Sequence, residues 1–137
     1  MVNDVIANTY KSLIDLVDTE MNIAMCKSDV SDFEIHPAIG FGIAIVRDAN
    51  IVSHPNMIIL DIPTVIEDYG QADAVTINVM SMYEEFRKTM GSKIVTYFSK
   101  YNVNCSSCEI GQFTPNYAIT DPSIRGLNGS VTLTIEL

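Results

Sequence analysis

The chain has 137 residues, a length that fits one domain spanning residues 1–137, and its 8 basic and 17 acidic side chains give a formal net charge of −9. Apolar residues make up 47% of the sequence, which is typical of a folded core and excludes a disordered chain. The negative charge excludes general attraction to nucleic-acid phosphates, although such a chain can lie beside DNA and repel it.

The first expected element is an amphipathic helix over residues 2–25. Its apolar side chains recur every three or four positions, the spacing of one helical face, at Val2, Ile6, Tyr10, Leu13, Val17 and Met21. Asp4 stands where a secretory signal would carry positive charges, so we expect no signal peptide and synthesis in the cytoplasm. No apolar run in the sequence approaches the roughly 20 residues that a membrane-spanning helix needs.

Two strands are expected next. The apolar run at residues 38–46 is rich in β-branched side chains and contains two glycines, which favours a strand over a helix. Residues 57–62 follow the turn-forming Pro55 and are apolar on both faces, as expected of a central strand. Pro63 marks the end of this strand or a sheet edge.

Residues 75–101 fit two patterns in their first part. Val75, Val79 and Phe86 fit one helical face, whereas Val75, Ile77 and Val79 also alternate as in a strand. The β-branched content of residues 75–79 favours a strand to about residue 82, followed by a helix to residue 101.

The last third of the chain predicts two strands joined by a long loop. The strands are expected around residues 105–113 and 131–137, and the loop 114–129 is rich in Pro, Gly, Asn and Asp. The loop contains Asn128-Gly129, a strong turn dipeptide. The predicted fold class is therefore α+β: a single mostly antiparallel sheet with two long helices packed on one face, in the order α-β-β-β-α-β-β.

The apolar positions of these elements define the expected core, which comprises Ile6, Leu13, Val17, Ile43, Ile45, Ile58, Leu60, Val75, Ile77, Val79, Phe86, Ile94, Phe98, Leu133 and Ile135. The final strand has one apolar face. Such a strand is suited either to closing the core of its own subunit or to pairing with a neighbouring copy, and the sequence leaves both possibilities open.

Candidate metal ligands are sparse. Cys105-x-x-Cys108 supplies two thiols, and a zinc site would also need His36 and His54, because there is no second CxxC pair. Two small thiols at the start of a strand are the simpler interpretation, and an odd number of cysteines without a signal peptide favours reduced thiols. Triad spacings, phosphate loops and HExxH motifs are missing from the sequence, so we expect no enzyme activity, no metal and no cofactor.

The order of these segments resembles a family. After the N-terminal helix come HPNMIILDIP, then DAVTINVMSMYEEF, then IGQFTPNYAITDPSIRGLNGSVTLTIEL. The last segment ends in a strand of alternating apolar residues. Before that strand come an earlier strand, a Phe-x-Pro bend, an acidic loop and the sequence Gly-Leu-x-Gly. This arrangement resembles the tail terminator (tail completion) proteins of long-tailed bacteriophages, or closely related neck proteins. Residues 26–54 depart from that pattern, since they are longer and more apolar than it leads us to expect.

The resemblance implies a structural virion protein of the tail or neck that forms a homo-oligomeric ring, usually six-fold, at the head-proximal end of the tail tube. Such a ring ends tube growth and joins the tube-forming protein to the head connector, without contact with a membrane. DNA passes through the lumen without specific binding, and a charge of −9 suits that role because a negative wall repels the phosphate backbone. Two alternatives stay open: another neck or connector protein, or a small metal-binding α+β module that uses Cys105 and Cys108.

This hypothesis assigns two sets of site residues. The expected contacts with sister copies or partners are Phe113, Pro115, Tyr117, Asp121, Ile124, Arg125 and Leu137. The expected lumen-facing carboxylates are Glu67, Asp68 and Asp73, which we place in a loop between strands.

Overall fold

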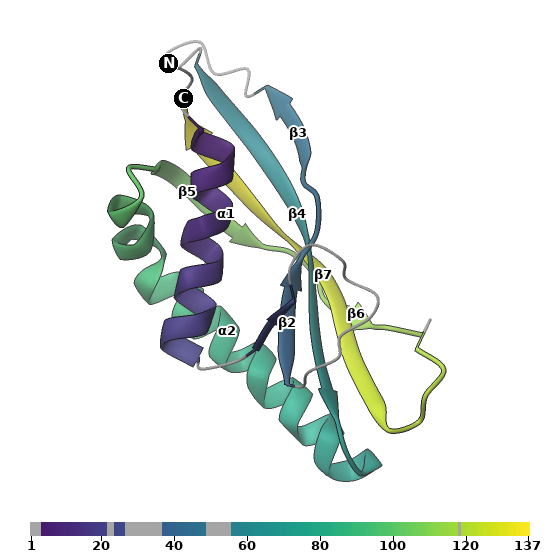
Figure 1. Ribbon diagram of the computed structural model, residues 1–137. Coiled ribbons are helices and arrows are strands. Elements are labelled where there is room, and N and C mark those ends of the chain that lie inside the picture. Colours follow the sequence, from purple (N-terminus) through teal and green to yellow (C-terminus); the bar gives the residue numbers. More distant parts are fainter. Residues whose placement is uncertain (1–3, 22–23, 27–36, 49–55, 118) are drawn as a thin grey trace.

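The computed structural model describes residues 4–21, 24–26, 37–48, 56–117 and 119–137 (Figure 1). The elements in chain order are α1 Val5–Leu16, the π-helical turn η1 Val17–Met21, β1 Ala24–Cys26, β2 Ala38–Phe41, β3 Ile45–Asp48, β4 Met57–Tyr69, α2 Ala72–Lys100, β5 Asn104–Ile110, β6 Thr114–Pro115 and β7 Ile124–Glu136. The predicted α+β class and element order are confirmed. In the described part of the chain, no helix has the length and apolar character to cross a membrane.

The sheet is built around two long strands. Its order is β1-β2-β4-β7-β5, with β3 also paired to β4 and β6 also paired to β7. Only the β1–β2 pair is parallel among these strands; the others are antiparallel. β4 and β7 have 13 residues each and pair along their whole length, from Met57 opposite Glu136 to Tyr69 opposite Ile124.

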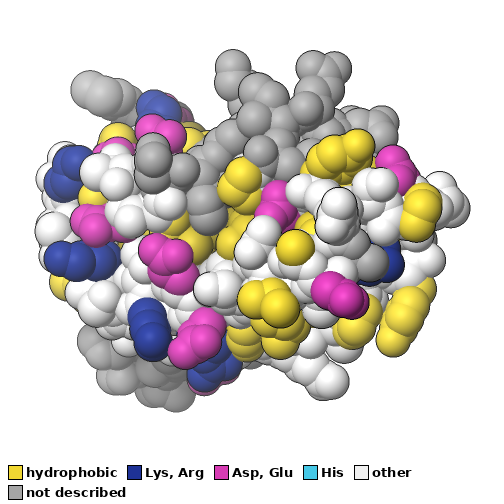
Figure 2. Space-filling model, turned by 90° about the horizontal axis from the view of Figure 1, so that it is seen from below, with side chains coloured by type: hydrophobic (Ala, Val, Ile, Leu, Met, Phe, Trp, Pro, Cys, Tyr) yellow, Lys and Arg dark blue, Asp and Glu magenta, His cyan; other side chains and the backbone are white. Residues whose placement is uncertain are grey.

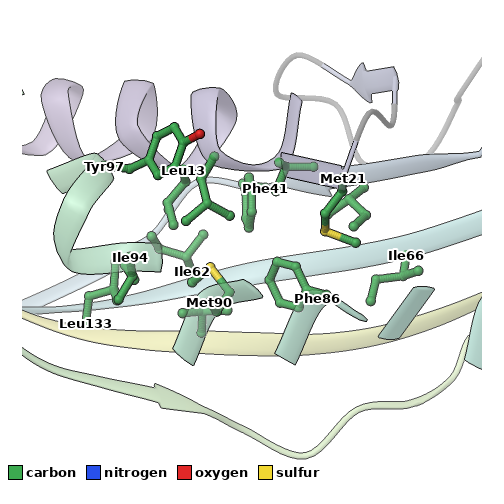
Figure 3. Packing of buried hydrophobic residues seen from close by; sticks show 14 of the residues in the cluster. Leu13, Met21, Phe41, Ile62, Ile66, Phe86, Met90, Ile94, Tyr97 and Leu133 are labelled. Carbon is green, nitrogen blue, oxygen red and sulfur yellow. The ribbon is translucent and has the colours of Figure 1, made fainter. Parts of the chain in front are cut away.

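The face of this central pair that meets the helices is apolar. Alternate residues of β4, including Ile58, Leu60 and Ile62, are buried opposite Ile135, Leu133 and Val131 of β7. Side chains of both helices complete the same cluster, and Figure 3 shows Leu13 of α1 and Phe86 and Met90 of α2 gathered with Ile62 and Ile66 of β4. Burying each such side chain contributes about 1.5–3 kcal/mol. Packing of both helices on one face is confirmed.

The side of β4 that faces away from β7 is paired in two separate pieces. The strand predicted at 38–46 is in fact two short strands, β2 and β3, which pair with the same edge of β4 on either side of Pro63. Proline has no backbone N–H, so the ladder cannot continue there. The Gly42 amide donates to the Pro63 carbonyl at 2.7 Å. The Tyr10 hydroxyl donates to the Gly42 carbonyl at 2.6 Å and accepts from the Ala44 amide at 2.8 Å, which replaces the missing ladder bonds.

Several predicted boundaries were wrong. β4 continues past Pro63 to Tyr69. The predicted strand at 75–82 is the first part of α2, because Val75, Val79 and Phe86 form a buried row at helical spacing and this packing outweighs the β-branched content. The predicted helix over 2–25 occupies residues 5–21, and residues 24–26 form a strand.

Four residues expected in the core are exposed instead: Ile6 (36%), Ile43 (86%), Ile45 (66%) and Ile77 (68%). The other eleven expected core residues are buried. The exposed four lie on outer helix faces or beside the interruption between β2 and β3.

The two helices are tied together near the end of α2. The Asp15 carboxylate accepts hydrogen bonds from Lys100 Nζ at 2.9 Å, Tyr101 Oη at 3.1 Å and Thr19 Oγ1 at 2.9 Å. The contact with Lys100, first of all, holds the pKa of Asp15 below its ordinary value of 3.8. A carboxyl group whose pKa is lower when folded than when unfolded stabilises the fold above about pH 4, and that stabilisation is lost as the pH falls through the folded pKa.

We therefore expect Asp15→Asn to be less stable than wild type at neutral pH, with the difference shrinking as the pH falls below 4. Thermal unfolding followed by circular dichroism between pH 2 and pH 7 measures it. Asp18→Asn, at an exposed position of η1, is the matched control. A gap between Asp15→Asn and wild type that does not change with pH would contradict the assignment.

Candidate assembly surfaces

The residues predicted to contact partners do not form one loop. Ile124 and Arg125 belong to β7, where they pair with Tyr69 and Asp68 of β4, so the predicted loop 114–129 was wrong over its second half. Asn128-Gly129 is likewise not a turn but lies within β7, opposite Val65 and Thr64. The sheet extends further than the turn-rich composition of this segment indicates.

Phe113 is engaged within the chain. Its ring lies 5.1 Å from that of Tyr83 and 6.4 Å from that of Phe86, measured between centroids, and it packs against the core. Phe113 can therefore contact a partner only through the part of its ring that is still exposed to solvent.

The segment around Tyr117 is the exposed part of the predicted contact set. Pro115, Tyr117 and Asp121 are exposed, Tyr117 to 88%. Backbone hydrogen bonds fix the segment at both ends, from the Asn116 amide to the Gly126 carbonyl at 2.9 Å and from the Ile124 amide to the Asp121 carbonyl at 3.1 Å. Figure 1 shows it projecting beyond the sheet next to β6 and the start of β7. The Asn116 contact holds the residue before Tyr117 against β7, and the Tyr117 side chain is exposed.

Leu137, at the labelled C-terminus, follows the end of β7 that lies away from β6 (Figure 1). Its side chain is 59% exposed, and its amide donates to the Asn56 carbonyl at 2.8 Å. The predicted contact set is therefore spread over two ends of the molecule.

The acidic residues predicted to face a lumen are divided as well. Glu67 and Asp68 lie in β4, not in a loop, and are only 5% and 7% exposed. Asp68 Oδ1 accepts a hydrogen bond from the Tyr69 amide at 2.8 Å. Asp73 is exposed in the first turn of α2, a position that also favours a carboxylate through the helix dipole. Of the three, Asp73 alone is open to solvent.

An apolar depression lies on the outer side of α2. It is shallow and wide open, has a volume of about 580 Å³, and is lined by Thr76, Ile77, Met80, Ser81, Tyr83, Glu84 and Arg87. Ile77 is 68% exposed and Met80 52%. We call this surface the α2 trough. Figure 2 shows hydrophobic side chains gathered toward the right of the lower face, interspersed with acidic ones, while most Lys and Arg side chains lie on the left.

A second apolar surface follows β3. Ile43, Ile45 and Val46 are exposed to 86%, 66% and 52%, and β3 pairs only with β4 among the described residues. Arg47 Nε forms an ion pair with Asp61 Oδ2 at 3.3 Å. We call residues 43–48 the β3 ridge. Sequence reasoning placed its isoleucines in the core, and their pattern contained no signal that would have shown them to be exposed.

The opposite edge of the sheet is better protected. β5 carries a bulge between Cys105 and Ser107, and its exposed positions are polar. Bulges and polar side chains are common devices that prevent edge-to-edge association. Of these two edges, β3 therefore exposes more apolar side chain.

The two thiols of β5 are partly buried, which favours their protonated form. Burial, and then the neighbouring Cys105 and Glu109, raise the pKa of Cys108 to about 12, and burial also raises the pKa of Cys105. A thiol must lose its proton to bind a metal. The described residues contain no group of three or more His, Cys, Asp or Glu side chains arranged to hold an ion, and His36 and His54 lie outside them.

No protein-family model matches this chain, and no curated protein matches its sequence. A solved structure with a similar fold is a chain from the virion of a native gene transfer agent particle. The TM-score is 0.52 at 12% sequence identity, and the match covers 99% of this chain and 100% of that chain. At this identity the likeness shows a shared fold, and it extends over both chains from end to end.

Proposed function

We propose that the chain is a structural protein of a phage-like virion and that it forms the ring that ends the tail tube at its head-proximal end. The fold likeness to a virion chain, over the full length of both, carries this proposal. The exposed apolar side chains of the β3 ridge and the α2 trough are available for contacts with neighbouring subunits in such an assembly.

The charge of the chain supports passage of DNA through such a ring. A net charge of −9 on each copy gives the assembly a field that repels phosphates, so DNA slides without being held. Asp73, exposed at the start of α2, is the carboxylate of the predicted lumen set that contributes most directly. No catalytic step forms part of this function.

The loop around Tyr117 is the proposed contact with the next layer of the particle. An exposed tyrosine side chain gives a large contact area with few rotatable bonds, which is typical of residues that dominate interfaces. Pro115 and Asp121 flank it on the same exposed segment.

The experiment is assembly of the cognate tail-tube protein with and without this chain. We expect increasing amounts of the chain to shorten the tubes, measured as a length distribution by negative-stain electron microscopy. Tyr117→Ala, which alters an 88% exposed side chain, is expected to fold normally and to shorten tubes much less. Val95→Ala, at a 70% exposed position of α2 outside the trough, is the matched control and should act as wild type.

Tubes that grow to unchanged lengths would contradict the terminator role. Binding to the head connector without an effect on the tubes would instead favour another layer of the neck.

A further inference from the structure

The side chains of β3 are uncovered on both faces of the sheet. Neighbouring residues of a strand point to opposite faces, yet all four residues of Ile45–Asp48 are exposed. Ile45 and Val46, on opposite faces, are 66% and 52% exposed. Burial of side chains therefore contributes little to holding β3 in place, and its attachment depends on the main chain and on a few polar contacts.

β2 offers a comparison within the same molecule. Both strands have four residues and pair with the same edge of β4, β2 over residues 64–67 and β3 over residues 58–61. All four residues of β2 are buried, the Phe41 ring lies 6.2 Å from that of Phe86 between centroids, and β2 also pairs with β1. Detaching β2 would expose part of the core, whereas detaching β3 exposes little apolar surface.

The ion pair between β3 and β4 is weak. Arg47 Nε lies 3.3 Å from Asp61 Oδ2, and the Arg47 side chain is 58% exposed, so water screens the attraction. Asp61 Oδ1 also accepts a hydrogen bond from Thr132 Oγ1 at 2.7 Å. The Asp61 carboxylate therefore keeps a hydrogen-bond partner when Arg47 moves away.

The residue that precedes β3 is held by Tyr10 of α1. The Tyr10 hydroxyl accepts a hydrogen bond from the Ala44 amide at 2.8 Å and donates one to the Gly42 carbonyl at 2.6 Å. The Gly42 amide donates to the Pro63 carbonyl at 2.7 Å, which anchors Gly42 to β4. Tyr10 therefore connects the start of the β3 segment to a position that is fixed on the sheet.

We propose that β3 is a strap that opens from β4 as a unit while β2 stays paired, with Gly42 as the fixed point and the Tyr10 hydroxyl as the latch. Figure 1 shows β3 at the rim of the sheet, where it can move away from β4. Opening leaves the outer edge of β4 unpaired over residues 58–61. Because an unpaired strand edge can pair with another strand, the strap determines whether this edge is covered or open. The opening is a property of the chain alone and does not depend on the terminator role.

The first test is amide hydrogen exchange of the wild-type chain, followed residue by residue by NMR spectroscopy. Alternate amides of β4 point toward its two neighbouring strands. We expect the amides that join β3 to β4 to have protection factors at least about 100-fold lower than the amides that join β2 to β4. Protection factors that are equal in the two sets would overturn the inference.

Urea below the unfolding range distinguishes a local opening from unfolding of the whole chain. An opening that exposes little surface is almost insensitive to urea, whereas global unfolding becomes easier in proportion to the surface exposed. We expect exchange of the β3 amides to stay nearly constant as urea is added and exchange of the β2 amides to accelerate. An equally steep dependence in both sets would show that β3 opens only when the whole chain unfolds.

Tyr10→Phe tests the latch, because it removes the hydroxyl and keeps the ring. We expect it to lower the protection factors of the β3 amides by about 5–10-fold, as expected for the loss of one or two hydrogen bonds. Tyr101→Phe is the matched control, since it removes the hydroxyl that donates to Asp15 at 3.1 Å. That hydrogen bond is present whether β3 is open or closed, so the control should lower the protection of β2 and leave that of β3 unchanged. Unchanged β3 protection in Tyr10→Phe would refute the latch, and the wild-type comparison tests the strap even if this variant does not fold.

Discussion

Leu133→Asp is expected to abolish folding. Leu133 is fully buried in β7, between Leu60 of β4 and Cys108 of β5. A carboxylate at this position has no partner, and moving an unpaired charge out of water costs at least several kcal/mol. Because a domain of this size is stable by only about 5–15 kcal/mol in total, that cost alone removes most or all of the stability.

The matched control is Thr134→Asp, one residue further along the same strand. Its side chain lies on the opposite face of the sheet and is half-buried at the surface. We expect it to remain soluble with a cooperative thermal transition, measured by circular dichroism, while Leu133→Asp is insoluble or lacks the transition. A folded Leu133→Asp would mean that the register of β7 is shifted by one residue.

Gly129→Ala is expected to destabilise the fold by about 1–3 kcal/mol, the usual cost of overpacking. An added Cβ would lie 2.3 Å from Phe113 Cδ1 and 2.4 Å from Phe113 Cγ, well inside van der Waals contact. These atoms are near the base of the ring, so a small rotation cannot relieve the clash. Phe113 must leave its position against Tyr83 and Phe86.

The control for this substitution is Gly91→Ala within α2. A Cβ at that position meets no atom within 4 Å. Replacing a glycine inside a helix with alanine reduces the backbone entropy lost on folding and is expected to stabilise the chain by about 0.5–1 kcal/mol. Urea unfolding of both variants measures the two effects. Equal free energies of unfolding for Gly129→Ala and wild type would show that Phe113 does not cover Gly129.

The contact between Gly129 and Phe113 also explains a sequence-based error. Asn128-Gly129 is a strong turn signal when read locally. In the structure the glycine is required because an aromatic ring from another segment covers the backbone there. Alternation of apolar residues did predict Leu133 and Ile135 correctly, since that pattern depends only on which face of the strand is buried.

The start of α2 shows the limit of local propensity. Val75 and Val79 satisfy both a helical and a strand pattern, and the β-branched residues between them favoured the wrong one. What decides between the two is a long helix packed on the sheet, with Phe86 as its centre. Such packing joins residues distant in sequence and cannot be deduced from a short window.

The candidate assembly surfaces were missed for a related reason. Ile45, Val46, Ile77 and Met80 are apolar, and a single sequence does not distinguish an apolar residue in a core from one that awaits a partner. The opposite error was made for Glu67 and Asp68. Two adjacent carboxylates favour an exposed loop, but these two lie buried in the central strand β4. Tyr117 was predicted as a contact residue, and the structure leaves its side chain exposed.

The most direct test of the central claim is cryo-electron microscopy of tail tubes assembled in the presence of this chain. The proposed function predicts a single additional ring at one end of each tube, with density that fits this fold. Density distributed along the tube walls, or tube ends that are identical with and without the chain, would contradict it.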